Sequence, residues 1–128
     1  MQATVINAAD APQPVGGYAQ AVDLKKFSRL LVISGQIPVR ADDGSVPADF
    51  TTQCRLAWGN VIAQLRAAGL AVENLIKVTI FLSDRRYAAE NRAVRQEVLG
   101  EHPVALTVII TGIFDEKWLL EIEAMAAE

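Results

Sequence analysis

The chain has 128 residues, of which 52% are hydrophobic and 21% are charged, and its net charge at pH 7 is −3. That length suits a single domain, residues 1–128, and the composition is typical of a folded protein rather than a disordered one. The acidic balance argues against nucleic-acid binding, and no apolar run approaches the ~18 residues of a membrane span. The first residues lack the basic patch and apolar stretch of a signal peptide, so we expect a cytoplasmic protein.

The first predicted elements are two strands. Residues 20–24 and the apolar run 30–33 are spaced to pair as a hairpin, with Lys25 and Lys26 near the turn. The second strand ends at Ser34 and Gly35, and residues 40–45 form a loop with an Asp-Gly turn signal.

A helix is predicted next, over residues 49–68. Apolar residues recur there at steps of three and four, which traces one face of a helix, with Asp49 as the N-cap and Gly69 at the end. Cys54, the only cysteine, falls on the apolar face, so we expect a buried, unreactive thiol and no intrachain disulfide.

A strand at 75–82 and a helix from Asp84 to about Leu99 follow. Alternation in the strand predicts two distinct faces, and Gly100 and Pro103 end the helix. The residues predicted to face inward from the helix are Tyr87, Asn91, Val94 and Val98. Those predicted to lie on its solvated face are Arg85, Arg86, Arg92 and Arg95, with Glu90 and Glu97 between them.

Two strands, 104–111 and 119–126, complete the chain. In the last one Leu120, Ile122 and further alternate residues share one face, and Glu121 and Glu123 share the other. The resulting order, ββ, α, β, α, ββ, predicts an α+β fold with one mixed sheet and two helices on one face. The other face is too apolar to meet water, so we expect a homo-oligomer.

Six segments, in order over nearly the whole chain, resemble the RidA (YjgF/YER057c/UK114) family. Residues 16–22 resemble the family's G-P-Y-S-Q-A-V, and residues 34–38 reproduce S-G-Q-I-P. Residues 67–70 and 76–82 resemble A-A-G and V-K-T-T-V-F-L, Asn91 matches the helix asparagine, and residues 120–126 resemble V-E-I-E-A-I-A. The resemblance implies a chorismate-mutase-like fold, a barrel-shaped homotrimer, and small-molecule clefts between subunits. It also implies cofactor-free hydrolysis of enamines and imines to ketoacids and ammonia.

The sequence departs from the family at its most important motif. Pro103 to Val108 align with P-A-R-S-[TC]-V, which places Ala105 at the arginine and Leu106 at the serine. In active relatives that arginine grips the substrate carboxylate, which neither of these side chains can do. Gly17 also stands where the family usually has proline. Arg29 or Arg92 from a neighbouring subunit could replace the lost arginine.

The resemblance selects the candidate site residues. Glu121 would place or activate the attacking water, and the backbone carbonyl of Thr107 would help to hold it. Ordinary structural roles compete with these: a solvated strand carboxylate for Glu121 and a β-branched strand residue for Thr107. The candidate substrate-binding residues are Tyr18, Ser34, Gly35, Asn91, Ala105, Leu106 and Trp118. For each of them a hairpin, turn or packing role is the alternative, and for Asn91 that role is hydrogen bonding to backbone groups.

Three functions remain open on these residues. The first is a deaminase-like hydrolase with weak or no activity on standard 2-imino acids, and the second is a trimeric module that binds a metabolite without turning it over. Ribonuclease activity, attached to some family members by name, fits poorly with the acidic charge. His102 is the only histidine and has no partners at metal-ligand spacing, so we expect no metal site. The resemblance implies that no cofactor is involved.

Overall fold

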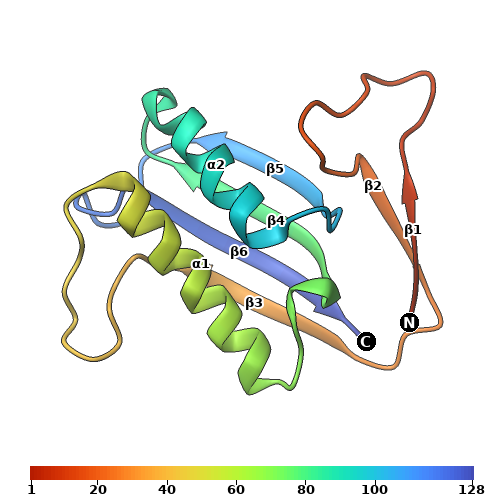
Figure 1. Ribbon diagram of the computed structural model, residues 1–128, viewed down its shortest axis with the longest axis horizontal. Helices are drawn as coiled ribbons and strands as arrows, with labels where there is room; N and C mark the ends of the chain where they lie inside the picture. The colour runs from red at the N-terminus through yellow and green to blue at the C-terminus, as the bar shows by residue number, and fades with distance from the viewer.

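A four-stranded mixed sheet forms the centre of the computed structural model, which describes all 128 residues (Figure 1). Its strands are β3 (Leu30–Gln36), β4 (Leu75–Leu82), β5 (Ala105–Ile110) and β6 (Leu120–Ala127). The spatial order is β3-β6-β4-β5, with β4 and β5 parallel and the other pairs antiparallel. The two central strands are therefore β6 and β4, and each of them is hydrogen-bonded to a neighbouring strand on both sides.

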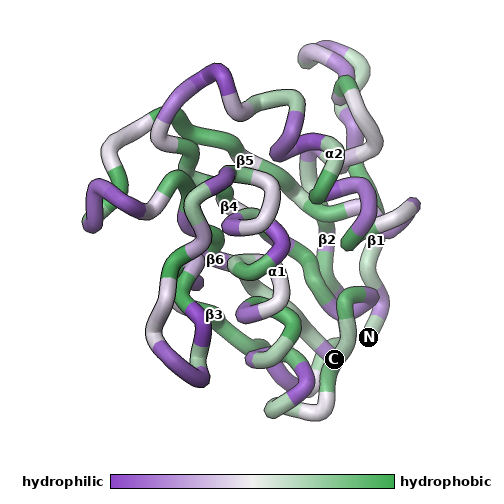
Figure 2. The backbone as a smooth tube through the Cα atoms, turned by 60° about the vertical axis from the view of Figure 1, so that its left-hand side comes forward, coloured by the Kyte–Doolittle hydropathy of each residue, from purple (hydrophilic) through white to green (hydrophobic).

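Two helices, α1 (Phe50–Ala67) and α2 (Ala88–Leu99), cover one face of this sheet, as predicted (Figure 1). Asp49 caps α1 by accepting a hydrogen bond from the Thr52 amide at 3.0 Å. Short 3-10 turns at Val72–Asn74 and Arg85–Tyr87 lead into β4 and α2. The core between helices and sheet includes Trp58 of α1 and Ile80 of β4, both fully buried. Hydrophobic residues are concentrated along these strands in Figure 2, while the loops are mainly hydrophilic.

The predicted hairpin between residues 20–24 and residues 30–33 does not form. β2 (Ala21–Lys25) pairs with β1 (Gln2–Ile6), a strand that we did not predict, and this two-stranded ribbon stands apart from the larger sheet (Figure 1). β3 pairs with β6 instead. The physical reason lies in the connection between β2 and β3, where Lys26 has a left-handed φ of 52° and the Ser28 amide donates to the Glu128 carbonyl at 2.7 Å. The connection is thus anchored to the end of β6.

One polar side chain of α1 joins two loops near the start of β6. Gln53 is buried, and its amide nitrogen donates to the carbonyls of Pro47 at 2.7 Å and Lys117 at 2.9 Å. Its amide oxygen accepts from the Leu119 amide at 2.8 Å. All of these groups lie outside the regular strands, so a single glutamine satisfies backbone groups that the sheet leaves unpaired.

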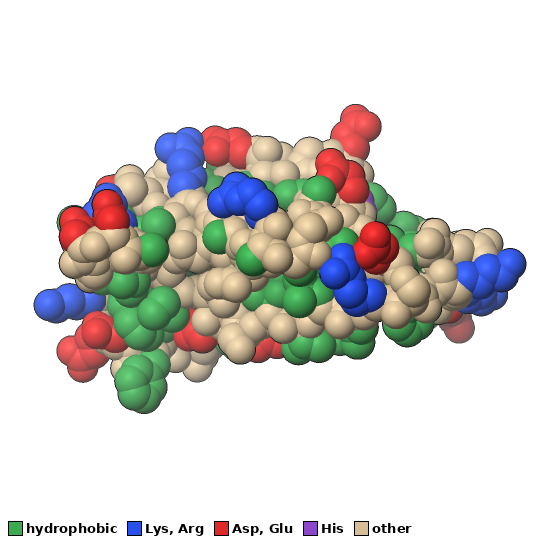
Figure 3. Space-filling view, turned by 90° about the horizontal axis from the view of Figure 1, so that it is seen from below, with side chains coloured by type: hydrophobic (Ala, Val, Ile, Leu, Met, Phe, Trp, Pro, Cys, Tyr) green, Lys and Arg blue, Asp and Glu red, His purple; other side chains and the backbone are tan.

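The face of the sheet opposite the helices is uncovered. Leu30 and Val32 of β3 and Ile109 of β5 are exposed on it, with Val32 68% accessible. Hydrophobic side chains reach the surface along the lower margin of the molecule in Figure 3, interrupted by acidic ones. We call this surface, made by the outward residues of the four strands, the open face. No helix is both long and apolar enough to cross a membrane.

Candidate functional site

Glu121 and Gly35 lie together on the open face. Leu120 and Ile122 are fully buried toward the helices, so the alternation of β6 directs Glu121 to the other side. A Cβ placed on Gly35 would overlap the Glu121 carboxylate oxygen Oε1 and lie 3.0 Å from its Cγ. β3 is irregular between Ile33 and Gln36, which is where Gly35 lies. The carboxylate therefore occupies the space that any side chain at position 35 would need.

A hydrogen bond between two side chains on the open face joins β4 and β5. The Lys77 ammonium donates to the Thr107 hydroxyl at 2.7 Å. Lys77 lies opposite Ala105 in the β4–β5 ladder, and Thr79 lies opposite both Thr107 on one side and Glu123 on the other. We did not single out Lys77 from the sequence, although its place in an alternating strand puts it on the same face as Thr79. It is the cation on the open face next to the position of the missing arginine.

Ala105 and Leu106 point to opposite faces of β5. Ala105 shares the open face with Lys77, whereas Leu106 lies beside Val78, packs against the core cluster and borders a hollow on the helix side. The methyl group of Ala105 cannot form a bidentate contact with a carboxylate. The two positions at which the sequence is expected to depart from the family motif therefore lie on two different surfaces of the molecule.

Tyr18 lies at the outer edge of β5, on the helix side. The segment that carries it runs along β5, because the Ala19 amide donates to the Val104 carbonyl at 2.9 Å and Ala19 bridges to Ala105. Tyr18 borders a hollow of about 310 Å³. The other residues that line it are Val15, Arg92, Arg95, Leu106 and Val108. We call this space the β5-edge hollow.

Two residues of α2 differ from their predicted environments. Asn91 is only 2% exposed and its amide oxygen has no hydrogen-bond partner, so the prediction that it satisfies backbone groups is wrong for this oxygen. Arg95 is 7% exposed, so its predicted place on the solvated face is wrong as well. Position 95 is one helical turn beyond position 91, so the twist of the helix brings both side chains to the inward face.

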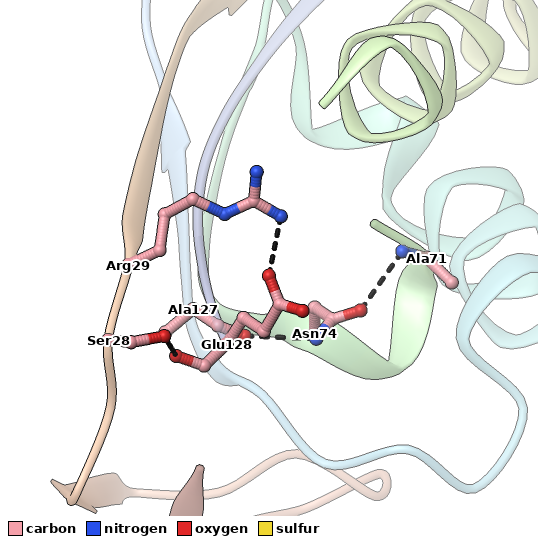
Figure 4. A network of polar contacts seen from close by, with 6 residues as sticks. All are labelled: Ser28, Arg29, Ala71, Asn74, Ala127 and Glu128. Carbon is pink, nitrogen blue, oxygen red and sulfur yellow. Dashed lines mark hydrogen bonds and ion pairs between the residues drawn. The ribbon is translucent and has the colours of Figure 1, made fainter. Parts of the chain in front are cut away.

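The remaining candidates are spread over the molecule. Ser34 is exposed on β3, close in sequence to Gly35. Trp118 precedes β6 and lies 6.5 Å from Phe114, ring centre to ring centre, near the ends of β4 and β5. That is the opposite end of β5 from Ala105, about 17 Å along the strand. Arg29 pairs with Glu128 at 2.6 Å at the far end of β6 (Figure 4).

The histidine and the cysteine have structural environments. His102 Nε2 donates to the Leu75 carbonyl at 2.8 Å, which joins the end of α2 to the start of β4. Cys54 is fully buried, and burial raises the pKa of its thiol to about 12. No three His, Cys, Asp or Glu side chains come close enough together to hold a metal ion.

In one copy of the chain the candidate residues form two separate groups. Glu121, Gly35, Ala105 and Thr107 belong to the open face, and Tyr18, Leu106 and Asn91 belong to the helix side. The open face is an exposed apolar surface that carries two carboxylates, Glu121 and Glu123, and the Lys77 ammonium. The fold and site together define a small α+β protein of the chorismate-mutase-like kind.

The chain belongs to the Endoribonuclease L-PSP family, the RidA/YjgF family, whose model matches residues 8–128. It is 46% identical over 128 residues to a RutC family protein of Pasteurella multocida, with 97% of each chain covered. It is 36% identical over 120 residues to the 2-iminobutanoate/2-iminopropanoate deaminase of Escherichia coli strain K12, with 91% of each covered. The crystal structure of E. coli TdcF with bound serine superposes with a TM-score of 0.74 at 36% identity, covering 98% of each chain. The predicted family and fold class are thereby confirmed.

Proposed function

We propose that this protein is a deaminase-type hydrolase that cleaves the C=N bond of a small imine or enamine. The observation that carries the proposal is the Glu121 carboxylate held against Gly35 on an apolar sheet face. The name of the E. coli relative, a 2-iminobutanoate/2-iminopropanoate deaminase, supports the class of reaction. The bound serine in the TdcF structure shows that a related fold receives a small amino-acid-like molecule.

Glu121 supplies the acid–base step of this reaction. Water adds to the carbon of the C=N bond while the carboxylate accepts one of its protons, and the nitrogen takes up a proton. The resulting carbinolamine collapses to a carbonyl compound and ammonia, so that one imine and one water give one carbonyl and one ammonia. Thr107 lies on the same face, and its hydroxyl already accepts a hydrogen bond from the Lys77 ammonium. The backbone carbonyl of Thr107 is therefore the group that orients the water.

The complete site forms between copies of the chain. The open face is too apolar to remain in water, and a homotrimer closes it against two neighbours. Such an assembly brings the edge of β5 of one copy, with Tyr18, toward the open face of the next, with Glu121. Neither group reaches the other within one copy, which is the reason to place the cleft at the interface.

The substrate differs from the short 2-imino acids of the relative's name. Ala105 presents a methyl group where the family's arginine would hold a carboxylate next to the reacting carbon. Lys77 offers a single point charge there, already hydrogen-bonded to Thr107, rather than a bidentate fork. The loss of a charge-assisted pair costs roughly 1.5–3 kcal/mol, so 2-iminopropanoate and 2-iminobutanoate should be poor substrates.

The same alanine supports a second candidate, a trimer that binds a small metabolite without hydrolysing it. The test is imine hydrolysis, with imines generated in situ by an amino-acid oxidase from apolar, aromatic and acidic amino acids. We expect hydrolysis of at least one imine by the wild type and a loss of about 10²-fold or more in Glu121→Gln. Glu123→Gln, two residues along the same face of β6, is the matched control and should retain full activity. Binding of the product ketoacids without hydrolysis of any imine would favour the second candidate.

A further inference from the structure

Arg95 is a buried charge without a partner in its own chain. Its guanidinium makes no hydrogen bond or ion pair, although the residue is only 7% exposed. Other arginines of the chain have partners: Arg29 and Arg55 each pair with a glutamate, and Arg40 and Arg86 each donate to a side-chain hydroxyl. Buried guanidinium groups are almost always paired, because an isolated one loses its hydration without compensation. Arg95 is therefore a largely buried cation that borders a hollow and has no anion beside it in its own chain.

Arg92 directs a second positive charge to the same place. It lies one turn before Arg95 on α2, and both residues border the β5-edge hollow. Burial, and to a lesser extent the charge of Arg92, lower the pKa of Arg95. A Cβ on Gly16 would lie 3.8 Å from Arg95 Nη2 and 4.0 Å from Arg92 Nε, so both guanidinium groups converge on one turn of the N-terminal loop. Two like charges this close favour an anion between them.

One wall of this hollow, and the loop beside it, carry positions at which the sequence is expected to depart from the family motif. Leu106, which replaces the motif serine, lines it directly. Gly17 has a φ of +81°, which proline cannot adopt, and Gly16 beside it has a φ of +99°. The glycine at position 17 thus gives the loop around Arg95 a shape that the usual proline would forbid. Leu106 and the unpaired arginine therefore share the β5-edge hollow, and Gly17 lines a second hollow that Arg95 also borders.

We propose that the β5-edge hollow is an oxyanion-binding subsite in which Arg95 and Arg92, beside the Tyr18 ring, hold a carboxylate or phosphate group of the ligand. This inference rests on the proposed function, because it names the substrate class of that site. Leu106 and Val108 point to the helix side of β5, and Ala105 points to the open face. The anion is therefore held away from the position that the family's arginine serves. The substrate class is an imine or enamine whose anionic group is several bonds from the reacting carbon.

The test is anion binding, measured by calorimetry with inorganic phosphate and with glutarate as probes. We expect Arg95→Gln to weaken binding by about 10- to 100-fold, the loss of one charge-assisted contact, and Arg92→Gln to weaken it less, because Arg92 is exposed. Arg66→Gln is the matched control, since Arg66 is an exposed arginine in the last turn of α1, and its affinity should equal that of the wild type. The probe that binds with the higher affinity identifies the oxyanion as a phosphate or a carboxylate.

Two measurements keep the proposal falsifiable if Arg95→Gln folds poorly. Arg95→Lys retains the charge without the fork and should bind with intermediate affinity. In the wild type, the Nε–H resonance of Arg95 should shift on addition of phosphate. Equal affinity of Arg95→Gln and wild type for both probes, or an unmoved Arg95 resonance, overturns the proposal. Dissociation of the oligomer in Arg95→Gln with unchanged anion affinity also overturns it, because Arg95 would then pair with a carboxylate of a neighbouring copy.

The proposed hydrolase and the oxyanion subsite can fail separately. Glu121→Gln should abolish imine hydrolysis and leave phosphate or glutarate affinity unchanged. Arg95-dependent anion binding in a protein that hydrolyses no imine would support the subsite and reject the hydrolase. Hydrolysis of imines with distal carboxylates that is equally fast in wild type and Arg95→Gln would support the hydrolase and reject the subsite.

Discussion

The Glu121 carboxylate lies in the space that a side chain on Gly35 would fill, so the two positions on β6 and β3 constrain each other. We expect Gly35→Ala to displace the carboxylate and reduce imine hydrolysis by at least about tenfold, because a misplaced base loses its geometry. The free energy of unfolding should change little, because the displaced atoms are the end of a flexible side chain on the open face. Chemical denaturation and the hydrolysis assay measure the two effects.

The control for this substitution is Gly59→Ala. Gly59 lies in α1, and a Cβ there would meet nothing within 4 Å. Alanine is the better helix former, so this variant should gain about 0.5–1 kcal/mol and keep its activity. Unaltered activity in Gly35→Ala would show that the Glu121 carboxylate does not depend on the glycine.

The second prediction concerns the motif on β5. Ala105→Arg combined with Leu106→Ser should raise activity on 2-iminobutanoate by about 10- to 100-fold, the effect of one charge-assisted carboxylate contact. Ala105→Arg alone should give part of this gain, because Leu106 faces the other side of the strand. Wild-type activity already equal to that of the E. coli deaminase would refute our interpretation of Ala105.

The third prediction tests the homotrimer. Val32 is 68% exposed on the open face, and a carboxylate at that position would be buried on assembly. Val32→Glu should therefore shift the protein from trimer to monomer in sedimentation velocity. Phe114→Glu is the comparison: Phe114 is 95% exposed but lies in the loop before β6, not on the open face. A trimer that survives Val32→Glu and dissociates in Phe114→Glu would place the interface elsewhere.

The fourth prediction concerns Cys54 and alkaline pH. Burial raises the pKa of this thiol from 9.0 to about 12, so the unfolded chain loses the proton first as the pH rises. The contribution of Cys54 to stability is complete below pH 9.0 and is lost progressively up to about pH 12. Unfolding measured from about pH 8 to about pH 11 should show a steeper decline for the wild type than for Cys54→Ala, which lacks this titration. Parallel curves would show that the thiol ionises as easily in the folded protein.

The sequence predicted the strands of the larger sheet and both helices within four residues, because strands such as β4 and β6 alternate cleanly and α1 has a clear cap. It did not predict β1. That strand is five residues long and fully exposed, so it lacks the burial pattern on which such a prediction depends. The partner of β2 was also wrong, since a contact between Ser28 and the last residue of the chain decides it.

The candidate site was predictable where a side chain follows strand alternation. Glu121 lies on the expected face. Gly35 is predicted to let a ligand approach the backbone, and in the structure the Glu121 carboxylate takes that space. The environment of Arg95 was not predicted, because a charged residue at an inward helical position is normally assigned to solvent. The spacing of one helical turn from Asn91, which is predicted to face inward, does indicate an inward position for Arg95. The separation of Tyr18 from Glu121 depends on how copies of the chain meet, which no single-chain pattern encodes.

The three hydrogen bonds of Gln53 have a consequence for local unfolding. Residues 47 and 117 are far apart in the chain, yet both carbonyls depend on one amide group that also holds the start of β6. Neither loop can leave its position without stranding a buried donor or acceptor. The amide protons of the two segments should therefore exchange with solvent in a single shared opening event, rather than each at its own rate. The loop before α1 and the loop before β6 thus behave as one cooperative unit next to the strand that carries Glu121.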